Sequence, residues 1–170
     1  MDGALGTQLR HLLEQIDGDV AKVYRDLGLA EYRPRFSPIV RTLVAQGPLS
    51  VRELALAVGV THSAASQTVA QLTKAGFTTQ EPGPTDARQR IVHLTDRTRE
   101  LLPAIEAEWT ATTAALASLD RELPYPLADF LAELQSALTT KPFRQRIADH
   151  AGAELSGSVV KNQSERPPRP

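Results

Sequence analysis

The chain has 170 residues, of which 41% are hydrophobic and 23% charged, and its formal net charge is −1. This length allows one compact domain, or a small domain with additional dimerisation helices, and the composition excludes a chain that is disordered throughout. The absence of cysteine excludes disulfides and thiol chemistry, and it fits a reducing cytoplasm, the compartment that we expect. The first residues lack a basic start with an apolar core, and no apolar run of about 18 residues exists, so we expect neither a signal peptide nor a membrane span.

The charge is unevenly distributed along the chain. Residues 50–99 carry six basic and four acidic side chains, whereas residues 100–150 carry four basic and eight acidic ones. A net charge near zero argues against a protein that binds nucleic acid over its whole surface. A basic central segment nevertheless permits local contact with phosphate groups.

Apolar residues at three- and four-residue steps predict the first two helices. The first amphipathic helix is expected over residues 5–27. Either Pro34, or Ser37 as an N-cap with Pro38 behind it, is expected to begin a second helix, which ends before Gly47.

Two short helices are expected next. Ser50, with Glu53 three residues later, has the spacing of a capping box and predicts a third helix that Gly59 closes. Thr61 is expected to cap a fourth helix that ends at Gly76. The connection between these helices is therefore short, as in a helix-turn-helix.

The remaining elements are a hairpin and a set of long helices. A short extended segment over residues 77–81 and an alternating segment over residues 91–95, separated by a turn, predict a β-hairpin. Thr95 or Asp96 is expected to cap a long helix with Pro103 near its start, and further helices follow. The expected fold is mainly α with a small β-hairpin wing. It has four parts: an N-terminal dimerisation helix (1–33), a winged helix-turn-helix lobe (34–95), C-terminal dimerisation helices (96–150) and a disordered tail (151–170). Within the lobe, the recognition helix is expected over about 62–75 and the wing over about 77–95.

The predicted fourth helix has the pattern of a recognition helix. Ala65, Val69 and Leu72 share one face and are expected to pack it onto the third helix, where Ala55 is small enough for a close crossing. The opposite face carries small or hydrogen-bonding side chains, which suit the donors and acceptors of the major groove. These candidate DNA contacts are Thr61, His62, Ser63, Ser66, Gln67 and, at the edge, Gln71. An ordinary solvent-facing surface is the alternative, and the helix pair alone leaves both interpretations open.

The tip of the hairpin favours DNA binding. Arg88 and Arg90 can reach phosphates or the minor groove, and Asp86 is expected to hold one of the two guanidinium groups in position. A surface ion pair worth under about 1 kcal/mol is the alternative. An arginine-tipped hairpin directly after a recognition-type helix is less expected by chance than either element alone.

The chain resembles the MarR family of bacterial winged helix-turn-helix regulators over roughly residues 5–140. The resemblance is carried by the segment ELALAVGVTHSAASQTVAQLTKAGF, by the wing DARQR and by IVHLTDRTRELL. The family wing usually has Asp, then Arg two residues later and another Arg, and Asp86, Arg88 and Arg90 match this pattern. Ala65 departs from the family, whose members often carry a larger β-branched residue there. The resemblance implies a triangular homodimer, with helices from both chain ends at its base.

The apolar helices at both chain ends independently call for a partner surface. They are too apolar to lie exposed beside so small a DNA-binding lobe. A two-fold dimer would separate two recognition helices by about 34 Å, which matches a near-palindromic operator in double-stranded DNA.

An effector pocket is the remaining expectation, because members of the family often bind small aromatic or anionic molecules. Tyr32, Phe36, Arg41 and Trp109 are the candidates, with core packing as the favoured alternative for each aromatic residue taken singly. The four histidines lie on separate elements without metal-ligand spacing, so we expect no metal and no cofactor. No catalytic motif is present, so we expect no enzyme.

The predicted function is a sequence-specific transcriptional regulator of double-stranded DNA, a repressor that a small-molecule effector releases. A winged-helix module for protein–protein contact, with little DNA binding, is the alternative. The weak net charge and the absence of basic residues at the start of the recognition helix support that alternative.

Overall fold

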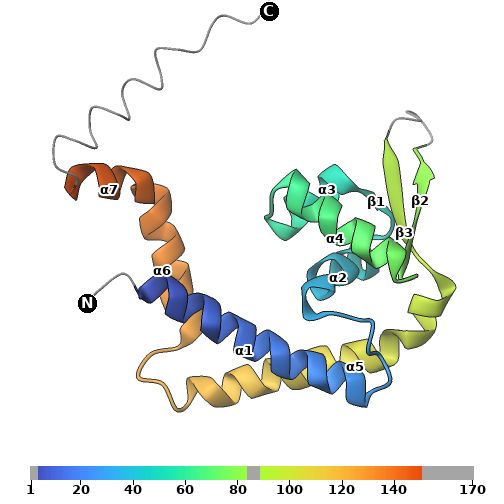
Figure 1. Ribbon diagram of the computed structural model, residues 1–170, viewed down its shortest axis with the longest axis horizontal. Helices are drawn as coiled ribbons and strands as arrows, with labels where there is room; N and C mark the ends of the chain where they lie inside the picture. Colours follow the sequence, from blue (N-terminus) through green and yellow to red (C-terminus); the bar gives the residue numbers. More distant parts are fainter. Residues whose placement is uncertain (1–3, 84–88, 151–170) are drawn as a thin grey trace, which may run out of the picture. The chain divides into compact units, whose positions relative to one another are not determined.

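The structure of the protein is a computed structural model that describes residues 4–83 and 89–150. It is mainly helical with one small sheet, which confirms the predicted fold class (Figure 1). In chain order the elements are α1 (Leu5–Asp26), η1 (Pro34–Phe36), α2 (Ser37–Gln46), β1 (Leu49–Ser50), α3 (Val51–Val58), α4 (His62–Lys74), β2 (Thr78–Pro82), β3 (Arg90–Leu94), α5 (Asp96–Asp120), α6 (Leu127–Thr140) and α7 (Phe143–His150). The chain divides into two compact units, residues 1–114 and 115–170, and the division falls within α5. The predicted tail, 151–170, lies outside the described residues.

The start of α3 is the capping box that the sequence predicted. The Ser50 hydroxyl accepts a hydrogen bond from the Glu53 backbone N–H (3.2 Å), and Glu53 Oε2 accepts one from the Ser50 backbone N–H (2.8 Å). Hydrogen bonds from the Ser50 side chain and backbone lower the pKa of the Glu53 carboxyl. Gly59 ends the helix in the left-handed conformation (φ 75°), which confirms its predicted role.

The helical segment before and including α2 begins at Pro34, one of the two predicted alternatives, but its first turn is a 3₁₀ turn. Pro34 begins a single 3₁₀ turn, and α2 follows from Ser37 without a side-chain cap, so the predicted cap at Ser37 is wrong. The Ser37 hydroxyl is used elsewhere: it accepts a hydrogen bond from Trp109 Nε1 (3.0 Å) and lies 3.2 Å from the Tyr24 hydroxyl oxygen. The 3₁₀ turn provides carbonyl oxygens that accept hydrogen bonds from backbone N–H groups at the start of α2, so no side-chain cap is needed. The Ser37 hydroxyl is therefore available to partners that are distant in sequence.

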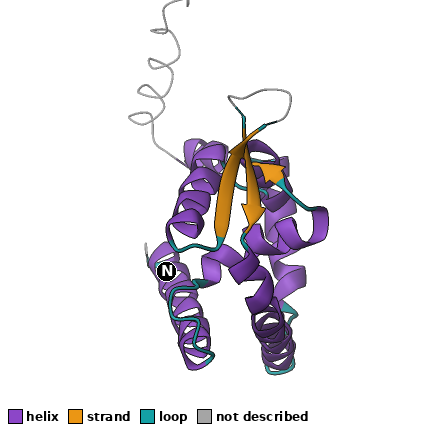
Figure 2. Cartoon of the chain, turned by 90° about the vertical axis from the view of Figure 1, so that its right-hand side faces the viewer, coloured by secondary structure: helices purple, strands orange, loops and turns teal. Residues whose placement is uncertain are grey.

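The three strands form an antiparallel sheet in the order β1-β3-β2 (Figure 2). The predicted hairpin is present, with Thr78 opposite Leu94 and Pro82 opposite Arg90. Strand β1 was not predicted, since two residues are too few to show an alternating pattern. It pairs Leu49 with Val92 and Ser50 with Ile91, and so joins the start of α3 to the wing.

The core of the first unit is built around an aromatic cluster. Tyr32 lies at its centre, with ring centroids 4.7 Å from Tyr24, 5.8 Å from Phe36 and 5.2 Å from Phe77. The other members of the buried core are aliphatic: Leu29, Ile39, Val40, Leu43, Leu54, Val69, Leu72, Val92 and Ile105. The cluster thereby holds four parts of the first unit together: α2, α4, the wing, and the loop that follows α1.

The first turn of α5 is capped by Thr95, whose Oγ1 accepts a hydrogen bond from the Thr98 backbone N–H (3.2 Å). Pro103 lies inside this helix. No helix in the described part of the chain is both long enough and apolar enough to cross a membrane.

Candidate nucleic-acid interface

Helix α4 has one buried and one exposed face, as its sequence pattern predicted. Ala65, Val69 and Leu72 are almost fully buried against the lobe. The opposite face is open to solvent, and it carries the candidate contacts Thr61, His62, Ser63, Ser66 and Gln67. These side chains offer hydrogen-bond donors and acceptors with no carboxylate among them, which is the chemistry that base edges in a major groove require.

The N-terminus of α4 is also exposed. Thr61 Oγ1 accepts a hydrogen bond from the Ala64 backbone N–H (3.2 Å), which confirms the predicted cap. The first turn contains no acidic side chain. The positive end of the helix dipole is therefore available to a phosphate or to another anion.

Gln71 differs from the other candidates on α4. It is half-buried, and its Oε1 atom is buried without a hydrogen-bond partner among the described residues. It lines a recess with Lys74 of the same helix and Arg33 of the loop after α1. Its predicted contact with DNA stays a prediction, and the structure orients part of its amide inwards.

The wing is described on both sides of its tip. Arg90, the first residue of β3, is exposed. Asp86 and Arg88 lie outside the described residues, so their predicted pairing stays a prediction. Below the tip, the Gly83 backbone N–H donates to the Gln89 carbonyl oxygen (2.8 Å) and holds the two strands together.

Three side chains connect the wing to α4, a link that the sequence pattern did not indicate. The hydroxyl oxygens of Thr73 and Thr78 lie 3.0 Å apart, and Gln80 Nε2 donates to Thr73 Oγ1 at 3.4 Å. Each contact joins the last turns of α4 to strand β2. These contacts join the C-terminal end of the recognition-type helix to the base of the wing.

A cavity of about 340 Å³ lies between α1, α2 and α5 in the first unit. Two of the four predicted effector residues meet at this cavity, since the Arg41 guanidinium carbon lies 4.5 Å from the centre of the Trp109 ring. The other two, Tyr32 and Phe36, are 1% exposed and belong to the aromatic core behind it. The remaining wall residues are Ile16, Asp17, Val20, Pro34, Ser37, Pro38, Glu108 and Thr112.

The carboxylate of Glu108 is a feature of this cavity that the sequence analysis missed. Glu108 is only 4% exposed and accepts hydrogen bonds from the hydroxyl groups of Tyr24 and Thr112. Burial, followed by the hydrogen bond to Glu108, raises the pKa of Tyr24. The only signal in the sequence is spacing, because Glu108 follows Ile105 by three residues and shares its inward face of α5.

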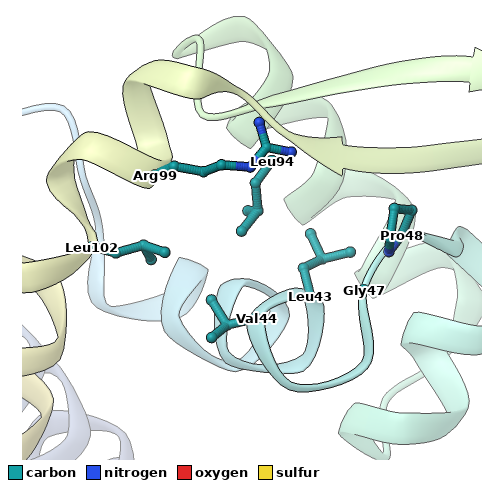
Figure 3. A pocket seen from close by; sticks show the side chains of 7 residues that line it. All are labelled: Leu43, Val44, Gly47, Pro48, Leu94, Arg99 and Leu102. Carbon is teal, nitrogen blue, oxygen red and sulfur yellow. The ribbon is translucent and has the colours of Figure 1, made fainter.

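A second cavity, of about 250 Å³, lies between the end of α2, strand β3 and the start of α5 (Figure 3). The side chains of Leu43, Val44, Leu94 and Leu102 point towards this space from three different elements (Figure 3). Arg99 is on its wall and pairs with an acidic residue of its own helix, Asp96, at 2.6 Å. Among residues 4–83 and 89–150, no group of three His, Asp or Glu side chains is arranged to hold a metal ion.

Comparison with known proteins gives one family and several related structures. Residues 37–89 match the family model described as MarR family. AbfR, solved bound to DNA in an overoxidized form, is 18% identical with a TM-score of 0.57, and the match covers 79% of this chain and 88% of that one. A cysteine-to-serine mutant of MarR from E. coli is 18% identical with a TM-score of 0.51, over 80% and 94% of the two chains. BpsR from Bordetella bronchiseptica, solved to explain how 6-hydroxynicotinic acid regulates its DNA binding, is 18% identical with a TM-score of 0.50, over 72% and 95%. No curated protein matches the sequence.

Proposed function

We propose that this chain, whose winged helix-turn-helix belongs to the MarR family as its sequence predicted, is a cytoplasmic homodimeric repressor that binds a near-palindromic operator and is released by a small molecule. The observation that carries the proposal is the exposed face of α4. It presents hydrogen-bonding side chains without a carboxylate and an open helix N-terminus, and the other end of α4 is joined to the base of the wing. AbfR, which shares the fold, has been solved bound to DNA.

Salt dependence of binding tests the wing. Replacing Arg88 and Arg90 with alanine removes two cations, so the slope of log affinity against log salt is expected to fall by about 2. Affinity for all DNA sequences is expected to fall together, because phosphate contacts carry no sequence information. Arg25→Ala is the matched control, since it removes an exposed cation at the end of α1. An unchanged slope in the double variant would show that the wing does not contact phosphate.

Sequence preference tests α4. Gln67→Ala is expected to cost about 1–3 kcal/mol of discrimination at one base pair, because a bidentate amide contact to a base is lost. The salt slope is expected to stay the same. An operator is first selected from random DNA sequences. Competition binding with its single-base variants, repeated at several salt concentrations, measures both the base discrimination and the salt slope. If neither set of variants alters binding, the chain fits the alternative of a module for protein–protein contact.

The dimer is proposed from the apolar surfaces of α1, α6 and α7. Helices α6 and α7 contain no buried residue, and the first part of α1 exposes leucines along its length. The exposed side chains are Leu5, Leu9, Leu12, Leu13, Phe130, Leu131, Leu134, Leu138, Phe143 and Ile147. A surface of this kind on a chain of this size is expected to be covered by a second copy. Sedimentation equilibrium at micromolar concentrations is expected to give twice the mass of the chain, and a monomer would contradict the proposal.

The effector site is proposed at the cavity between α1, α2 and α5. Five of its ten wall residues are apolar, and Asp17 and Glu108 add carboxylates. Arg41 supplies a cation next to the Trp109 ring, which suits the carboxylate of a planar aromatic acid. BpsR, a structural relative, is regulated by such a molecule. Trp109 is the only tryptophan, so its fluorescence reports directly on the cavity. Titration with 6-hydroxynicotinic acid is expected to change this emission and to weaken DNA binding, and Arg41→Ala is expected to abolish both effects. A response that survives Arg41→Ala would place the ligand elsewhere.

A further inference from the structure

The C-terminal end of α4 is held by one arginine from the first turn of α5. Arg97 Nη1 donates to the Ala75 carbonyl oxygen (3.2 Å), directly after the last turn of α4. Arg97 Nη2 donates to Glu31 Oε2 (3.1 Å), on the loop after α1. The guanidinium carbon also lies 5.3 Å from the centre of the Phe77 ring. One side chain therefore joins three segments that are far apart in the sequence.

The neighbouring threonines bind the same turn. Thr95 Oγ1 donates to the Gly76 carbonyl oxygen (2.9 Å), and Thr98 Oγ1 donates to the Phe77 carbonyl oxygen (2.7 Å). Gly76 has a positive φ of 78°, and a Cβ built on it would lie 3.3 Å from Arg97 Nη1. Glycine therefore provides both the turn and the room for the guanidinium group.

We propose that Arg97 is a positioning residue for DNA binding, which fixes the C-terminal end of α4 to the loop after α1 and to α5, so that a displacement of either segment reaches the recognition helix. This inference rests on the proposed function. The forked guanidinium suits the role, because two of its nitrogens donate in different directions to different partners. A cation at a helix C-terminus also interacts favourably with the helix dipole.

The main competing explanation is that Arg97 contacts DNA phosphate, since its side chain is 54% exposed. The two explanations predict opposite signs for Glu31→Gln. If Arg97 positions α4, loss of the carboxylate loosens the helix end and weakens DNA binding, by about twofold to fivefold for an exposed pair. If Arg97 contacts phosphate, loss of the nearby negative charge tightens binding and raises the salt slope.

DNA binding by the 170-residue chain and its variants is measured with a DNA fragment that the wild type selects from random sequences. Arg97→Gln is expected to weaken binding by about tenfold, because the carbonyl contact is lost together with the ion pair. The DNA affinity of Arg97→Lys is expected to lie between those of the wild type and Arg97→Gln, since one ammonium group cannot replace both guanidinium donors. The double variant with Glu31→Gln is expected to bind no more weakly than Arg97→Gln alone. Arg99→Gln is the matched control, because Arg99 pairs only with Asp96 of its own helix among the described residues.

Hydrogen exchange without DNA separates this inference from the proposed function. In the wild type, the Ala75 and Gly76 amides donate to carbonyl groups of the last turns of α4. Their exchange is expected to be several-fold faster in Arg97→Gln and in Glu31→Gln, and unchanged in Arg99→Gln. Equal exchange in all variants, or tighter DNA binding by Glu31→Gln, would overturn the inference. If the wild type binds no DNA, the proposed function fails, and the exchange result alone decides whether Arg97 holds the helix.

Discussion

The winged helix-turn-helix lobe and the helices α6 and α7 bury their apolar residues differently. In the lobe, Leu54 and Leu72 are completely buried, and helices α3 and α4 each begin with a side-chain cap. In α6 and α7 no residue is buried, although α6 is the more apolar of the two helices. The side chain of Phe130 on α6, for example, is 57% exposed. The lobe therefore buries its apolar residues within the first unit, whereas the apolar residues of α6 and α7 stay exposed on the described chain.

The largest expected effect breaks the lobe itself. Leu54→Ala removes a completely buried side chain from the contact between α3 and the core, and is expected to cost about 2–5 kcal/mol of unfolding free energy. Urea unfolding at several protein concentrations measures this loss. Because the contact lies within one lobe, the loss is expected to be the same at each concentration. Leu56→Ala on the same helix is the control, since Leu56 is 75% exposed.

A smaller effect is expected for an exposed residue of α6. Phe130→Ala is expected to weaken dimerisation at least about tenfold, because aromatic side chains at the centre of an interface contribute more than their neighbours. Sedimentation equilibrium measures the dissociation constant. The exposed Glu133→Ala variant of the same helix is expected to dimerise as the wild type does. An unchanged dissociation constant for Phe130→Ala would mean that α6 lies outside the interface.

Removal of the side-chain cap of α3 is expected to have a smaller effect than either of these two substitutions. Ser50→Ala eliminates a side-chain acceptor that is 2% exposed and that holds the Glu53 backbone N–H. The expected loss is about 1 kcal/mol of unfolding free energy, with the dimer unaffected. Denaturant midpoints of the two proteins give the difference. Ser63→Ala, at an exposed position of α4, is expected to leave stability within about 0.5 kcal/mol of the wild type.

The smallest effect is a dependence on pH. Since its hydrogen bonds to Ser50 lower the pKa of Glu53 in the folded state, the carboxylate stabilises the lobe above the pKa of the unfolded chain. This stabilisation is lost as the pH falls through the folded-state pKa. Wild type and Glu53→Gln are therefore expected to differ in unfolding temperature near neutral pH and to converge in acid. A difference that grows on acidification would contradict the assigned hydrogen bonds.

Local rules predicted the parts of the lobe whose partners are near in sequence. Ser50, Gly59 and Thr61 each act within four residues of their own position, so spacing alone identified their roles. The buried and exposed faces of α4 followed from helical periodicity in the same way.

The parts that were not predicted depend on distant partners. The buried carboxylate of Glu108 accepts a hydrogen bond from Tyr24, which is 84 residues away in the sequence. The Ser37 hydroxyl accepts a hydrogen bond from the indole N–H of Trp109, which is 72 residues away. Arg97 likewise holds a loop 66 residues before it. Nothing in the local pattern of a charged or hydroxyl side chain identifies such a partner, so these contacts emerge only when the chain is folded.

Strand β1 limits how this protein can be cut and recombined. Ser50 is both the last residue of β1, paired with Ile91, and the cap of α3. A chimeric regulator that borrows only the helix pair would separate the cap from the strand that holds it. A portable fragment therefore has to begin before Leu49 and to include β3 to Leu94, and grafts that begin inside α3 are expected to lose their specificity together with their fold.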